Sequence, residues 1–143
     1  MIGEEQFNVV QPNAGDVRDD TLGKEVWFAY GAMSGINKTN ANGVATGHFF
    51  DSTMYVLGIQ LNIQPAVKGS FYEAWLTDEE GIQMQSAGHL TNPFGDVHHQ
   101  LRFDMKKDLR PLKHIVVTLE KDDGNPSPSD QRVAEGTIKE QKR

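Results

Sequence analysis

Short hydrophobic runs follow one another from residue 25 onward, and turn-forming residues separate them. They recur at about 8–12 residues, a spacing typical of β-sandwiches and barrels. The run 53–63 alternates most clearly, because every second residue is apolar and all of these share one face of a strand. That face consists of Tyr55, Leu57, Ile59, Leu61 and Ile63. No part of this region keeps a helical period, so we expect strands.

The runs define the expected strands. They cover residues 25–30, 43–51, 53–63, 70–78, 82–90, 96–104, 113–121 and 132–139, and the stretch 34–42 has the composition of a loop. The pattern predicts an all-β fold, an immunoglobulin-like antiparallel β-sandwich of about seven to nine strands. In the run 113–121, Ile115, Val117 and Leu119 are expected to face inward, and His114, Thr118 and Glu120 outward.

The same pattern suggests one domain with a polar arm. Residues 1–24 have few apolar positions and are expected to form an arm with at most one edge strand. Residues 25–140 form the predicted sandwich, and residues 141–143 form a basic tail. A chain of 143 residues commonly folds around a single core.

Charge argues against nucleic-acid binding. The chain has 20 acidic and 14 basic residues, a formal net charge of −6, whereas a nucleic-acid-binding domain carries a clustered basic face. Basic residues gather in 102–110 and 139–143, but acidic residues interrupt the first group and the second is a tail. Both are interpreted as solvated surface.

The chain contains no cysteine, which excludes disulfides, thiolate nucleophiles and iron–sulfur sites. No run approaches the ~20 apolar residues of a membrane span. The first residues, from Met1 to Glu5, lack the basic and apolar regions of a signal peptide. We therefore expect a soluble polypeptide without membrane insertion, with any anchor or export signal absent from the sequence given.

Histidines are the candidate metal ligands, because imidazole binds zinc and copper. The five are His48, His89, His98, His99 and His114. Adjacent residues of a strand point to opposite faces, so His98 and His99 cannot easily chelate one ion. Isolated or hydrogen-bonded histidines are the simpler interpretation. If a metal site exists, its candidate ligands are His89 and His98 on neighbouring strands.

Other candidate sites are weaker. The loop 122–130 offers oxygen ligands of the kind that calcium prefers, but it lacks the ligand order of an EF-hand and is more simply a rigid turn. Glu73 is a single carboxylate, whereas glycoside hydrolysis uses a matched pair. No nucleophile elbow, zinc-protease motif or phosphate-binding glycine loop is present. We therefore predict no catalytic residue and no cofactor.

Aromatic residues could line a binding face for sugars or peptides. The candidates are Trp27, Tyr30, Phe49, Phe50, Trp75 and Phe94. Aromatic residues in strands are more often core, because each buries a large apolar area. Core is the favoured interpretation of Trp75. For Phe94, which lies in a turn, both interpretations stay open.

Several short motifs in the C-terminal half carry a family resemblance. Their order is Tyr-x-x-Trp-Leu, Ser-x-Gly, Val-Thr-Leu-Glu, and then a Gly/Asn/Pro/Ser loop. In order and spacing, residues 42–139 resemble the extracytoplasmic C-terminal domain of anti-sigma-K factors. The matching positions are Tyr72, Trp75, Leu76, Gly88, Thr118 and Glu120.

The resemblance implies a β-sandwich outside the cytoplasmic membrane. In that family the domain follows a cytoplasmic sigma-binding region and one membrane span, and this sequence has neither. It implies no catalytic residues, and we assign the matching positions to the fold.

The expected function is that of a non-enzymatic extracytoplasmic sensor or protein-interaction domain, in the periplasm or on the cell surface. Its partner would be another protein or the rest of its own full-length chain. The alternative is a metal- or carbohydrate-binding β-sandwich that uses His89 and His98 or exposed aromatic residues. A hydrolase with an unrecognised site ranks last.

Overall fold

The computed structural model describes residues 18–19 and 21–142. All regular secondary structure in these residues is β-strand, which confirms the all-β prediction. The strands are β1 (Arg18–Asp19), β2 (Gly23–Gly35), β3 (Ala41–Phe50), β4 (Tyr55–Ile63), β5 (Ser70–Thr77), β6 (Met84–His89), β7 (His98–Met105), β8 (His114–Lys121), β9 (Arg132–Thr137) and β10 (Lys139–Glu140). Within this part of the chain, no helix has the length and apolarity needed to cross a membrane.

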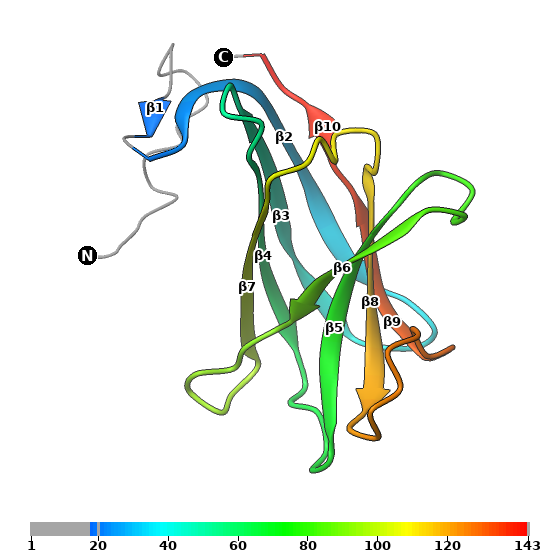
Figure 1. Ribbon diagram of the computed structural model, residues 1–143. Helices are drawn as coiled ribbons and strands as arrows, with labels where there is room; N and C mark the ends of the chain where they lie inside the picture. The colour runs from blue at the N-terminus through cyan, green and yellow to red at the C-terminus, as the bar shows by residue number, and fades with distance from the viewer. Residues whose placement is uncertain (1–17, 20, 143) are drawn as a thin grey trace.

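The strands form one antiparallel sheet that curls into a nearly closed barrel (Figure 1). The order around the sheet is β6-β5-β8-β9-β2-β3-β4-β7, and the short strands β1 and β10 both pair with β2. The two ends of the path meet where Thr91 and Gln100 exchange backbone hydrogen bonds of 2.8 and 2.9 Å. The sheet is therefore continuous and barrel-like, and the described strands do not clearly divide into the two layers of the predicted sandwich.

The long strand β2 explains this difference. On one edge it pairs with β3 from Glu25 to Ser34. On the other edge, residues 29–30 pair with β10 and residues 33–35 pair with β9. The chain bends between β9 and β10, and there a Cβ on Gly31 would lie 2.0 Å from the carbonyl oxygen of Thr137. Only glycine permits this backbone approach. A single strand thus joins sheet halves that would be separate layers in a sandwich.

The bounds of the strands differ slightly from those predicted. The first long strand begins at Gly23 and not at residue 25. The short strand β1, which pairs with β2, lies in the segment where at most one edge strand was predicted. The remainder of the arm, residues 1–17 and 20, lies outside the described residues. The predicted loop 34–42 is shorter, because β2 and β3 extend into it from both sides. In the predicted tail, the Gln141 N–H donates to the Phe28 carbonyl at 2.8 Å.

The barrel interior combines large and small side chains. The predicted inward face of β4 is confirmed, because each of its residues is almost fully buried: Tyr55, Leu57, Ile59, Leu61 and Ile63. Several facing inward positions of β2 and β3 are small, although both strands also place large residues in the core. The small ones are Ala29, Gly31, Gly43, Ala45 and Gly47. A Cβ on Gly47 would lie 2.9 Å from Ile138 and 3.0 Å from the Tyr55 hydroxyl. Alternation of small and large residues fills a small barrel without voids.

A buried hydrogen-bond chain lies on the outward face of β5 and β8. The Trp75 indole N–H donates to the Thr118 hydroxyl at 2.9 Å, and that hydroxyl donates to the Glu120 carboxylate at 2.5 Å. The Ser129 backbone N–H donates to the same carboxylate oxygen at 2.8 Å. Thr118 and Glu120 were expected on the outward face, but they are buried, because the loop after β8 returns to bond Glu120.

Two core tyrosines allow a matched test of how much a hydrogen bond to a buried hydroxyl group contributes to stability. The Tyr55 hydroxyl is buried without a hydrogen-bond partner among the described residues, and burial raises its pKa. The Tyr72 hydroxyl donates to the Gln64 carbonyl at 2.7 Å. We expect Tyr55→Phe to raise the free energy of unfolding by about 1 kcal/mol and Tyr72→Phe to lower it by a similar amount. Urea denaturation measures both, and equal losses in the two variants would contradict this account.

The chain from Trp75 to Glu120 predicts a second effect on stability. Thr118→Val keeps the shape of the side chain but leaves the Trp75 N–H without its acceptor and Glu120 without one donor. The free energy of unfolding should fall by about 1–3 kcal/mol. Thr46→Val, on the outward face of β3, is the control and should change it by less than about 0.5 kcal/mol. Thermal and urea denaturation followed by circular dichroism measure the difference.

Candidate functional site

Polar side chains form rows across the outward face of β2, β3, β4 and β7. The strand register places Ser34, Asn42, Asn62 and His98 opposite one another in consecutive strands. The next row contains Ala32, Val44, Gln60 and Gln100. Residues opposite one another on neighbouring strands share a face, so these rows lie together on one surface.

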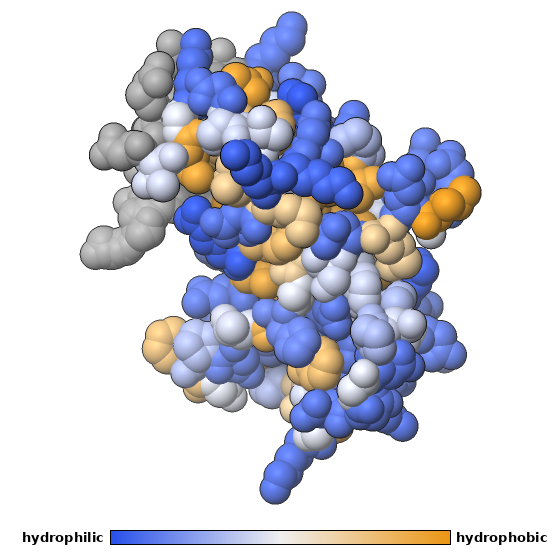
Figure 2. All heavy atoms as spheres, in the orientation of Figure 1, coloured by the Kyte–Doolittle hydropathy of each residue, from blue (hydrophilic) through white to orange (hydrophobic). Residues whose placement is uncertain are grey.

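These rows form the floor of a groove. The groove has a volume of about 960 Å³, and the loop between β6 and β7 forms one wall with Pro93, Phe94 and Asp96. Phe94 is 82% exposed, and the tip of its loop shows hydrophobic atoms on the surface (Figure 2). We call this hollow the β3–β4–β7 groove. Its floor comes from rigid strands, and its aromatic wall comes from a loop.

Alternation along β4 and β7 explains why the floor is polar. Leu61 and His99 point into the barrel and are buried, so Gln60, Asn62 and Gln100 must point outward. The sequence pattern contained this information, since these amides occupy the polar positions of alternating strands. It was missed because isolated amide residues match no motif.

Hydrogen bonds organise part of the groove. The Asn62 amide donates to the Asn42 carbonyl oxygen at 3.0 Å, which leaves the Asn62 carbonyl oxygen and the Asn42 amide group available. At the rim, Asp96 accepts hydrogen bonds from the His98 ring and from its backbone N–H, both at 3.0 Å. These bonds hold the pKa of Asp96 below its ordinary value. The floor is therefore partly pre-organised.

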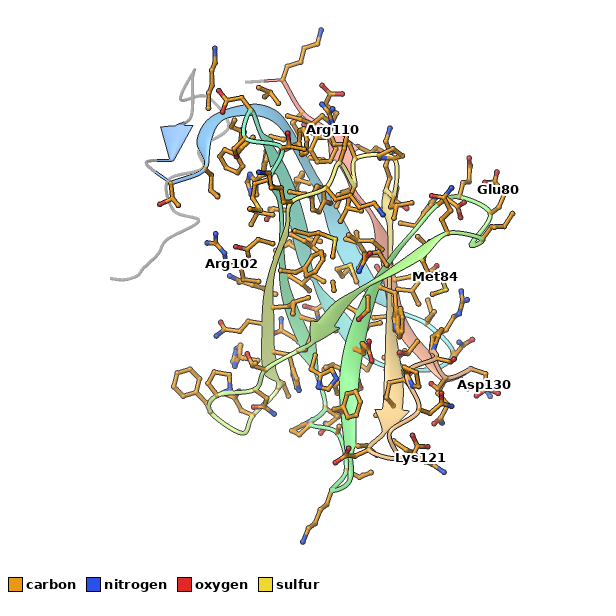
Figure 3. All side chains as sticks on the ribbon, viewed as in Figure 1. Glu80, Met84, Arg102, Arg110, Lys121 and Asp130 are labelled. Carbon is orange, nitrogen blue, oxygen red and sulfur yellow. The ribbon has the colours of Figure 1, made fainter. Side chains whose placement is uncertain are left out.

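The charges of the groove are few. Asp96 is its carboxylate and is paired with His98, and the lining residues of the described chain include no lysine or arginine. The nearby Arg102 of β7 points away from the sheet and lies 3.8 Å from Asp104 (Figure 3). Amide groups offer both donors and acceptors, and Phe94 and Val44 add apolar surface. This arrangement is suited to binding an uncharged polar molecule.

The two candidate metal ligands have different surroundings. His89 of β6 stacks on the Phe71 ring with centroids 3.9 Å apart, whereas His98 is bonded to Asp96 in the groove. In the part of the chain that the structure describes, no group of three or more His, Asp or Glu residues could hold a metal ion. Metal binding by His89 and His98 remains a prediction.

The other histidines each have a hydrogen-bond partner. His48 is buried on the outward face and lies 2.8 Å from the Glu25 carboxylate, while its ring stacks on Phe28. The ring of His99 lies 2.9 Å from the Val97 carbonyl oxygen. His114 lies 2.9 Å from the Thr137 hydroxyl. Glu25 was not singled out from the sequence, because its partner is 23 residues away.

The remaining candidates can also be placed. Glu73 accepts a hydrogen bond from the Ser86 hydroxyl at 2.6 Å. In the acidic loop, Asp123 and Asn125 each accept the backbone N–H two residues ahead, as in the rigid turn that was expected. Four of the six aromatic candidates are buried: Trp27, Phe49, Phe50 and Trp75. Tyr30 and Phe94 are exposed.

The pair at the groove rim has a measurable signature. The pKa of Asp96 should lie below the ordinary value of about 3.9, and His98→Ala should raise it toward that value. A depressed pKa means that Asp96 favours the folded state above its ordinary pKa, and that this contribution is lost as the pH falls through the folded-state pKa.

Carboxyl-detected NMR titration measures this shift. Asp108, whose pKa is lowered by a hydrogen bond from Arg110, is the internal control and should not change in His98→Ala. An unchanged Asp96 in that variant would contradict the assigned cause.

Comparisons of this chain with models of protein families, with curated proteins and with solved structures find no match. Its function must therefore be argued from the groove, from the buried network and from the motif resemblance.

Proposed function

We propose that this chain is a non-enzymatic binding domain outside the cytoplasmic membrane, a sensor or protein-interaction domain similar to the ectodomain of anti-sigma-K factors. The observation that carries the proposal is the buried chain from Trp75 through Thr118 to Glu120. Trp75 belongs to one motif of the resemblance, and Thr118 and Glu120 belong to another. The contacts among them support a common structural origin of the motifs.

The hydrogen-bonded residues of this buried chain are far apart along the sequence. Trp75 and Thr118 are 43 residues apart and still share a buried hydrogen bond. Ser129, in the loop that the resemblance also includes, bonds the carboxylate at the end of the chain. The two motifs lie on the paired strands β5 and β8, and we interpret their contact as support for one structural unit. Tyr72 and Leu76, from the same resemblance, pack in the core.

The strand order is compatible with kinship to an immunoglobulin-like sandwich. The path contains two sets of adjacent strands, β6-β5-β8-β9 and β2-β3-β4-β7, and both contribute to one core. We propose that these sets correspond to the two layers of such a sandwich. The continuous pairing of β2 with β9 would then be a local joining of the layers.

Exposed apolar loop tips favour contact with a partner. Ile82 at the tip of the β5–β6 hairpin is 80% exposed, and Val67 before β5 is 71% exposed. Hydrophobic atoms are visible at the hairpin tip (Figure 2). Figure 1 places the loops 64–69 and 91–97 at the end of the barrel opposite β1 and β10. These exposed apolar side chains are the surface that we propose for contact with a partner protein.

The location can be tested with a reporter fusion. Leaderless β-lactamase is fused to the C-terminus of the full-length natural gene product and expressed in a bacterium. The enzyme protects the cell only outside the cytoplasm, so we expect ampicillin resistance. A matched fusion to green fluorescent protein, which matures in the cytoplasm, should stay dark if the domain is exported unfolded. Sensitivity to ampicillin together with bright fluorescence would contradict the proposal.

A further inference from the structure

We infer that the β3–β4–β7 groove binds a neutral carbohydrate. This inference rests on the proposed function, since it names the ligand class of a binding domain. It is argued from three properties of the groove, namely its amide rows, its exposed aromatic ring and its lack of unpaired charge.

The amide rows match the chemistry of hydroxyl groups. A sugar hydroxyl both donates and accepts a hydrogen bond, and an amide side chain offers both partners. Gln60 and Gln100 are register neighbours on adjacent strands, which lie about 4.8 Å apart. Two neighbouring hydroxyls of one ring can therefore reach two amides at once. The strands fix the backbone positions of these two residues before any ligand arrives.

Phe94 supplies the apolar part of the site. A sugar ring has C–H faces as well as hydroxyl edges, and an aromatic face packs well against such a surface. Phe94 lines the groove and is 82% exposed, so its ring is available for this contact. Gly95 has a φ of +70°, and its backbone N–H donates to the Asn92 carbonyl at 3.1 Å, which holds the loop in a tight turn.

The charges that line the groove favour a neutral carbohydrate over charged ligands. A phosphate or an acidic peptide would need lysine or arginine in the groove, and its described lining has neither. A basic ligand would need a free carboxylate, but Asp96 is already paired with His98. A neutral, hydroxyl-rich ligand satisfies the amides and leaves no buried charge without a partner.

The inference is tested by NMR titration of the folded chain with cellotetraose, mannotetraose and triacetylchitotriose. At least one of these oligosaccharides should shift the side-chain amide signals of Asn42, Gln60, Asn62 and Gln100. Gln100→Ala and Phe94→Ala should each weaken the apparent affinity at least tenfold. Gln85→Ala is the matched control, because Gln85 lies on β6 and donates to the Ser86 carbonyl at 2.9 Å. It should leave the affinity unchanged.

Three results would overturn the inference. The first is the absence of shifts with all three oligosaccharides while the spectrum shows a folded protein. The second is binding that survives both groove variants. The third is a groove that responds to tryptic peptides of casein and not to oligosaccharides, which would indicate a peptide ligand. Each leaves the reporter-fusion test of location unaffected, so the failure of one proposal can be told from the failure of the other.

Discussion

Pairing along both edges of β2 is the constraint on which the rest of the structure depends. One edge of β2 pairs with β3, which leads to the strands that form the polar floor of the groove. The other edge pairs with β9 and β10, and β9 leads to β8 and β5, which hold the buried chain from Trp75 to Glu120. The junction requires Gly31, because the Thr137 carbonyl occupies the space of a side chain. Without this junction, backbone hydrogen bonds of the described strands would join the two halves only at the Thr91–Gln100 bridge.

Polar side chains are buried on the outside of the barrel as well as apolar ones inside it. Glu25 with His48, and Thr118 with Glu120, are buried on outward faces of the sheet. Buried polar groups are tolerated when each finds a partner, and partnered groups favour one arrangement over others. The outward surface thus contains regions of buried, hydrogen-bonded polar groups as well as the open β3–β4–β7 groove.

Sequence patterns predicted the strands well, because alternation is a local property. The inward face of β4 could be read from every second residue between Tyr55 and Ile63. Pairing partners could not be read in this way, since the contact of Gly31 with Thr137 joins distant parts of the chain. For the same reason the sequence favoured a sandwich and not a barrel. Among the outward-facing residues of the groove, Phe94 and His98 were singled out from the sequence, whereas the amides were not, because their rows appear only when the register is known.

The bridge between Thr91 and Gln100 has a thermodynamic consequence. It closes the barrel with one residue pair, and Thr91 begins the same loop that carries Phe94 and Asp96. Breaking the Thr91–Gln100 bridge would displace the loop that forms a wall of the groove, whereas the hydrogen bonds between the other strands would stay in place. A ligand held between floor and wall binds the closed form in preference to the open one, so its binding and the closure of the barrel are linked equilibria. Binding of a ligand in the groove would therefore stabilise the backbone pairing between Thr91 and Gln100.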